Sequence, residues 1–104
     1  MVFHTINGTA IVETTDISYF KADGNYTQMV TFHGTEMIVK GIGSIVKTLD
    51  QKTFIRADRS TVVNIHNIAQ LIPRERRCIF RSSDGQETET TLLAPAFKRL
   101  EAFL

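Results

Sequence analysis

The residues of this chain best suited to chemistry are two arginines in its most apolar region. Arg56 and Arg59 lie in the stretch FIRADRSTVVNIHNI, residues 54–68, just before a pair of valines. A hydrophobic core does not accept an unpaired guanidinium, because burying its charge is costly. On a strand, positions 56 and 59 point to opposite faces, so a turn must begin between them if both are to reach water. Residues 57–60, Ala-Asp-Arg-Ser, have the composition of such a turn. This predicts that Arg59 and Ser60 project from a loop tip.

Two further groups of basic residues could meet a negatively charged partner. PRERR, residues 73–77, places Arg76 and two more arginines beside a predicted strand, where they could contact phosphates. The alternative is a solvated turn in which Glu75 offsets the charge. Lys98 and Arg99 are ambiguous in the same way, since basic residues are also favoured near the C-terminus of a helix.

Enzymatic motifs and metal-binding motifs are absent from the sequence. The three histidines are too widely spaced for a zinc site. There is no phosphate-binding G-x-x-x-x-G-K-[ST] loop, and Ser60 lacks the G-x-S-x-G context of a hydrolase nucleophile. The single cysteine, Cys78, lies in the apolar run CIF and is expected to be a buried, inert thiol. We therefore expect a binding protein without catalysis, cofactor or metal.

Length and composition limit the kinds of protein that this chain can be. A chain of 104 residues is predicted to form one domain, residues 1–104, with its own core. No apolar run approaches the roughly 20 residues that span a bilayer, so no membrane insertion is expected. A lone cysteine fits a reducing cytoplasm. A net charge of +1 is lower than is typical of nucleic-acid-binding domains. Such a function must therefore depend on where the charges lie.

Most of the chain has the pattern of short strands separated by turns. The β-branched and aromatic stretches predict strands at 9–13, 17–22, 26–32, 35–39, 78–81 and 86–93. Asp23-Gly24, His33-Gly34 and Ser83-Asp84-Gly85 predict tight hairpin turns between neighbouring strands. In the last strand Glu87 and Glu89 share one side, as on an edge strand with a solvated face. The fold class is therefore mostly β, with antiparallel sheets.

Two segments have helical periodicity. Ile42, Ile45, Val46 and Leu49 form an apolar stripe, and the glycines at 41 and 43 place the start of that helix near residue 44. A second helix is predicted from Pro95, which suits a first helical turn. Its apolar face would carry Phe97, Leu100 and Leu104.

These features resemble LytTR-type DNA-binding domains. The family's signature has a phenylalanine and an arginine leading into an Arg-Ser loop, an apolar pair and an asparagine, as in FIRADRSTVVNIHNI. ISYFKADGNYTQMVTFHG is similar to its strand-turn-strand, and GSIVKTLDQKTF fits the helix between the two. A last helix from Phe97 to Leu100 sits where the family has one. The resemblance runs from about residue 9 over nearly the whole chain, in order and at matching spacings.

The resemblance implies an elongated fold of β-sheets, usually fused behind a receiver domain in bacterial response regulators. The family inserts loops, rather than a recognition helix, into successive grooves of double-stranded DNA. A dimer on DNA is left open. Arginine can pair with guanine or enter a narrow minor groove, while serine and asparagine bind phosphates or base edges. The residues carried over as DNA contacts are Lys21, Asn25, Thr27, Arg59 and Ser60, to which we add Arg76 and Lys98 as basic candidates.

Three residues around the loop are expected to support it. Arg56 would brace the tip, paired with Asp58, and Asn64 is interpreted as a structural turn residue. Family members commonly have histidine where this chain has Asp58, and a carboxylate there would repel phosphates unless an arginine neutralises it. The family also often has a Ser-Arg pair entering the last helix, whereas residues 93–96 are Leu-Ala-Pro-Ala. One expected base contact is thus missing.

Together with these residues, the resemblance implies a sequence-specific DNA-binding output domain of a bacterial transcriptional response regulator. One alternative is a β-rich protein-interaction module that keeps the fold without binding DNA. Another is a small β-barrel that binds RNA, which would need exposed aromatic side chains for stacking. Tyr26 could supply one of them.

Overall fold

The computed structural model describes residues 1–104 and consists mainly of short antiparallel strands. The strands are β1 (Val2–Thr5), β2 (Gly8–Ile11), β3 (Ile17–Asp23), β4 (Tyr26–Thr31), β5 (Gly34–Ile38), β6 (Phe54–Asp58), β7 (Thr61–Asn64), β8 (Ile68–Ile72), β9 (Arg77–Arg81) and β10 (Glu87–Thr91). The helices are α1 (Ile42–Val46) and α2 (Ala94–Glu101), with short 3₁₀ turns η1 (Thr14–Asp16) and η2 (Ile65–Asn67).

The strands form two sheets. A seven-stranded sheet has the order β2-β1-β5-β4-β3-β7-β6, and a three-stranded sheet has the order β10-β9-β8. Most neighbours are consecutive hairpins, so tight turns account for the pairing. Gly24 and Gly85 have φ of 60° and 90°, values that these turns need and that glycine adopts without strain.

Alternation along β3 and β7 divides the apolar residues between two cores. Phe20 and Val62 face α1 and join a cluster with Phe54, whereas Val63 faces the three-stranded sheet and packs in a cluster with Phe80. The Tyr19 and Phe80 rings stack at 5.4 Å between the two sheets. The Val62-Val63 pair therefore holds one strand between both cores.

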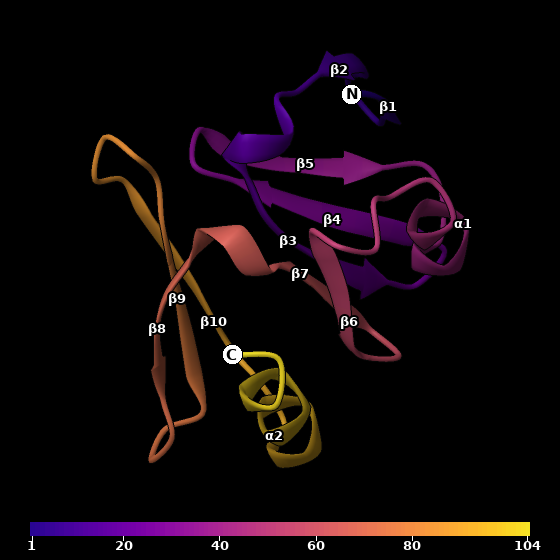
Figure 1. Ribbon diagram of the computed structural model, residues 1–104. Helices are drawn as coiled ribbons and strands as arrows, with labels where there is room; N and C mark the ends of the chain where they lie inside the picture. The colour runs from indigo at the N-terminus through magenta and orange to yellow at the C-terminus, as the bar shows by residue number, and fades with distance from the viewer.

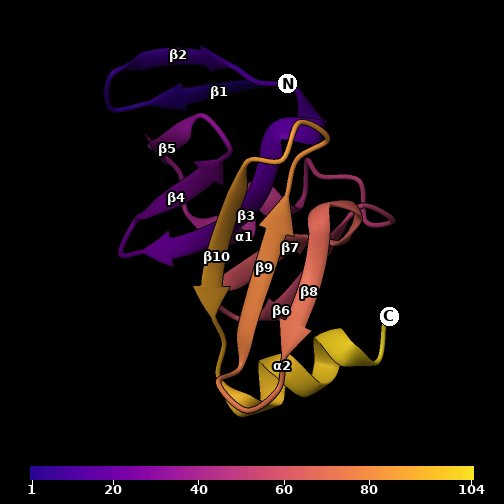
Figure 2. The ribbon, with the colours of Figure 1, turned by 90° about the vertical axis from the view of Figure 1, so that its left-hand side faces the viewer.

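The three-stranded sheet covers only part of the larger one. In Figure 2 it lies over the region of β3, β6 and β7 and leaves β4, β5 and the β1–β2 hairpin uncovered. Helix α2 packs against β6, which is one edge of the seven-stranded sheet. Figure 1 shows α2, the turn between β6 and β7, and the turn between β8 and β9 at the same lower side of the molecule.

The fold class and the six strands predicted from the sequence are confirmed, with ends that differ by a residue or two. The predicted starts of both helices are late. The first helix begins at Ile42 with Gly41 as its N-cap, because Gly43 is tolerated inside a helix that buries Ile42 and Ile45. The second begins at Ala94. Its apolar face ends at Leu100, and Leu104 lies exposed beyond the helix, contrary to the prediction.

Candidate nucleic-acid interface

Arg59 and Ser60 form the two-residue connection between β6 and β7, at the tip of a hairpin. Both are exposed, and the Arg59 side chain has no hydrogen bond or ion pair. The hairpin is anchored by Phe54 and Val62 in the core beneath α1. Its turn is also tied to β3, because the Ala22 N–H donates to the carbonyl of Ser60 at 2.8 Å. The tip is thus a free guanidinium on a fixed backbone.

Arg56 braces this tip through backbone oxygens. Its Nε donates to the Asp58 carbonyl at 3.2 Å, and its terminal nitrogen donates to the Arg59 carbonyl at 2.8 Å. The expected pairing of Arg56 with the Asp58 carboxylate is wrong. That carboxylate instead accepts the Ser60 N–H at 2.8 Å, which closes the turn. Arg56 nevertheless occupies the supporting position predicted for it.

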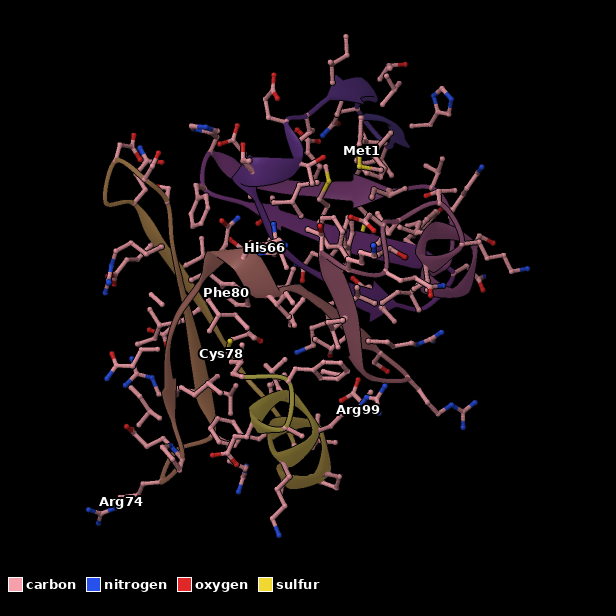
Figure 3. All side chains as sticks on the ribbon, in the orientation of Figure 1. Met1, His66, Arg74, Cys78, Phe80 and Arg99 are labelled. Atoms are coloured by element: carbon pink, nitrogen blue, oxygen red, sulfur yellow. The ribbon has the colours of Figure 1, made fainter.

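Arg99 of α2 is a further brace, which the sequence left ambiguous. Its Nε donates to the Arg56 carbonyl at 2.8 Å, and its guanidinium lies 5.6 Å from the centre of the Phe103 ring. Figure 3 places Arg99 beside the β6–β7 turn. The last helix is therefore hydrogen-bonded to the strand that carries the tip. Only the basic character of α2 hinted at this contact in the sequence.

Three of the predicted DNA contacts meet at one hollow. Lys21 of β3, Ser60 of the tip and Arg76 of the β8–β9 turn line a depression of about 340 Å³. Lys21 is adjacent to Thr61 across the sheet, so β3 and the tip are in direct register. Asp58 lies in the same wall, together with residues 91–93 at the entrance to α2. Both sheets and the segment that leads into α2 thus contribute to one partly basic surface.

The three arginines of PRERR have different surroundings. Arg76 has a φ of 55° and donates from Nε to the Leu92 carbonyl at 3.0 Å, which fixes its stem beside the hollow. Arg77 forms a two-pronged ion pair with Glu89, at 2.8 and 3.0 Å. This pair holds the pKa of the Glu89 carboxyl below its usual value. Arg74 points away from the molecule (Figure 3).

Thr27 corrects the predicted set of DNA contacts. Its side chain is fully buried, and its hydroxyl donates to the Lys40 carbonyl at 2.8 Å. It lies on the face of β4 that also carries the buried Met29, so it cannot reach a ligand with its side chain. Asn25 is exposed in the β3–β4 turn, and Lys98 is exposed on α2; neither lines the hollow.

Asn64 has the structural position expected for it. It is buried at the end of β7, and its Nδ2 donates to the carbonyls of Ile17 and Thr14 at 3.0 and 3.3 Å. Its Oδ1 accepts the His66 N–H at 3.0 Å and so begins the η2 turn. This side chain joins β7 to the start of β3. It holds the base of the hairpin rather than its tip.

The other residues with reactive side chains offer no second site. Cys78 is buried, and burial raises the pKa of its thiol to about 12. No group of three or more histidine, cysteine, aspartate or glutamate side chains is placed to hold a metal ion. No helix in the structure has the length and apolar character to cross a membrane.

Comparison with known proteins identifies the family. The family model of the LytTr DNA-binding domain matches residues 7–91. The chain belongs to the LytTR DNA-binding domain family. Among solved structures it is similar to the LytTr DNA-binding domain of a putative methyl-accepting/DNA response regulator from Bacillus cereus. The two share 21% identity over 99% of this chain and 96% of that one, with a TM-score of 0.67. No curated protein matches the chain.

Most residues of the hairpin tip and the hollow lie within the region that the LytTR family model matches. The matched region contains the tip, Lys21 and Arg76. Helix α2 lies beyond the matched residues. The structural similarity to the Bacillus cereus domain nevertheless covers 99% of the chain, so it includes most or all of α2.

Proposed function

We propose that this LytTR domain is the output domain of a bacterial transcriptional response regulator and reads DNA sequence through the β6–β7 tip. The observation that carries the proposal is the Arg59 guanidinium, free and exposed on a backbone fixed by Arg56 and by the bond to Ala22. A pre-positioned arginine can pair bidentately with guanine or enter a narrow minor groove. Ser60 beside it can bind a phosphate or a base edge.

In this proposal the hollow beside the tip receives the DNA backbone. Lys21 and Arg76 supply positive charge from two directions, and their placement compensates for a net charge of only +1. Phosphate contacts of this kind set the register on the duplex without reading bases. Asn25 and Lys98 lie outside the hollow and would reach neighbouring phosphates on either side.

The regulatory setting is part of the same proposal. The similar Bacillus cereus domain comes from a response regulator. A receiver domain would accompany this domain in the full regulator, two copies would bind adjacent DNA sites, and the protein would act in the cytoplasm. Recognition of DNA in this way requires neither catalysis nor a cofactor.

The salt dependence of binding tests the phosphate contacts. We expect about four to six contacts, so the logarithm of the affinity should fall against the logarithm of salt with a slope near −4 or −5. Arg76→Ala should weaken binding to all sequences alike and reduce the slope by about one. Titration of duplexes at several salt concentrations measures both. Arg81→Ala is the matched control, because Arg81 is paired with Glu87 and lies outside the hollow.

Two results of this titration would contradict the proposal. If the domain binds no duplex even at low salt, the alternative holds: the domain is a protein-interaction module that keeps the fold without binding DNA. If Arg81→Ala lowers the slope as much as Arg76→Ala, the hollow is not the phosphate site.

Asp58 offers a second test in the same hollow. Asp58→Asn keeps the side-chain oxygen that accepts the Ser60 N–H and removes the negative charge. We expect an unchanged melting temperature and tighter binding to all duplexes, because a carboxylate near phosphates is repulsive. Asp58→Ala removes the acceptor as well and should lower the melting temperature. Equal affinity of Asp58→Asn and the unmodified domain would show that the Asp58 carboxylate does not face DNA.

A further inference from the structure

The two edges of the seven-stranded sheet differ in protection. At β6 the edge is covered, because α2 packs on it and Arg99 bonds to the Arg56 carbonyl. At β2 nothing covers the edge (Figure 2). Proteins usually protect an open edge with a charged residue, a proline or a bulge. The sequence of β2, GTAI, has none of these, and its register with β1 is regular.

Free backbone groups on β2 can be identified from its pairing with β1. Met1 and Val12 exchange both of their hydrogen bonds, at 2.7 and 2.8 Å, so they form a hydrogen-bonded pair. Such pairs alternate along an antiparallel ladder, so Ala10 also bonds to β1 while Thr9 and Ile11 do not. The N–H and C=O groups of Thr9 and Ile11 therefore point outward from the sheet.

Two large apolar side chains at this edge are unusually exposed. Ile11 is 84% exposed, and Val2, its direct partner on β1, is 60% exposed. The remaining residues of β2 are small or uncharged. A regular, uncharged strand with free hydrogen-bonding groups and an exposed isoleucine is suited to pair with another strand.

We propose that β2 pairs with β2 of a second copy of this chain, antiparallel, across a two-fold axis that passes at Ala10. A two-fold axis makes the contact self-complementary, since each copy offers the same surface. With Ala10 opposite Ala10 of the second copy, Thr9 lies opposite Ile11 and Ile11 opposite Thr9. Each of these two pairs then exchanges both of its hydrogen bonds. The same register brings the exposed Val2 and Ile11 side chains of the two copies onto one face.

This register makes a covalent prediction. The two Ala10 residues would form a non-hydrogen-bonded pair, with Cα atoms about 4.5 Å apart. That separation is within the range of about 4.4–6.8 Å that a disulfide can bridge. Ala10→Cys should therefore form a disulfide-linked dimer under mild oxidation. The native Cys78 is buried and does not compete. Thr9→Cys is the control, because in the proposed register the two Thr9 residues are offset along the strands.

The experiment measures the mass of the 104-residue protein against concentration by analytical ultracentrifugation. The mass should rise toward that of a dimer. Ile11→Lys should keep the protein monomeric, because it places two positive charges beside the axis. Ile6→Lys, the same substitution at an exposed position in the β1–β2 turn, should leave the association unchanged. Because β2 and β6 are opposite edges, Ile11→Lys should not alter affinity for a single DNA site, so this result is separate from that of the proposed function.

Three outcomes would overturn the inference. The first is a protein that stays monomeric at millimolar concentration. The second is cross-linking of Thr9→Cys without cross-linking of Ala10→Cys. The third is a dimer that survives Ile11→Lys, which would place the contact on another surface.

Discussion

Arg59→Ala should weaken binding to the cognate DNA site by about fivefold to about a hundredfold and leave folding unchanged. The loss follows from the discrimination of about 1–3 kcal/mol that a base-reading arginine supplies, at about 1.4 kcal/mol per tenfold. The melting temperature should not move, because the Arg59 side chain is exposed and makes no hydrogen bond or ion pair within the protein. An ordinary surface substitution changes stability by no more than about 0.5 kcal/mol. Binding titrations and thermal unfolding on the same samples measure both.

Two controls separate base reading from charge. Arg59→Lys keeps the positive charge but loses the planar fork, so it should bind non-specific DNA normally and lose preference for the cognate site. Arg74→Ala removes an arginine that points away from the body of the molecule and should have little effect on either. If Arg59→Ala unfolds the domain and leaves binding per folded molecule intact, Arg59 is a structural residue and the proposed reading is wrong.

Asn64→Ala should have the opposite signature, a large loss of stability without a specific loss of binding. The change leaves the His66 N–H without its partner and removes one of the two donors from each of the Thr14 and Ile17 carbonyls. Three hydrogen bonds of a buried side chain are lost, each worth about 0.5–1.5 kcal/mol, so we expect a total near 2–4 kcal/mol. For a domain of this size, such a loss lowers the melting temperature by at least about 8 °C.

The matched control for Asn64 is Asn25→Ala, the same chemical change at an exposed turn residue without a side-chain hydrogen bond. Its melting temperature should equal that of the unmodified domain. Chemical denaturation of both variants, with DNA binding measured on the folded fraction, completes the comparison. A stable Asn64→Ala domain that no longer binds DNA would reassign Asn64 from the framework to the interface.

The sequence predicted what local patterns control. Alternation in β3 and β4 and the glycine turns identified the hairpins, and the clash between a charged Arg59 and its apolar neighbours located the tip. Thr27 shows where this reasoning stops. The family resemblance implied a DNA contact at this position, but the face of a strand that is buried depends on what packs against it, here α1 and its neighbours.

Contacts between residues far apart in the chain could not be predicted from the sequence pattern. The bond from Arg99 to the Arg56 carbonyl joins residues 43 positions apart, and no local periodicity encodes it. Likewise, the hollow shared by Lys21, Ser60 and Arg76 exists only because the three-stranded sheet packs across the larger one. The predicted pairing of Arg56 with the Asp58 carboxylate was wrong because a sequence does not show whether an arginine bonds to the carbonyl or to the carboxylate of a residue.

The central claim is that the β6–β7 tip reads a base through Arg59. Selection of bound sequences from random duplex DNA, carried out in parallel with the unmodified domain and with Arg59→Ala, tests it most directly. The account predicts a defined motif for the unmodified domain, and the same motif for the variant with preference lost at one position or two adjacent ones. An identical motif from both proteins, or no motif from the unmodified domain, would contradict it.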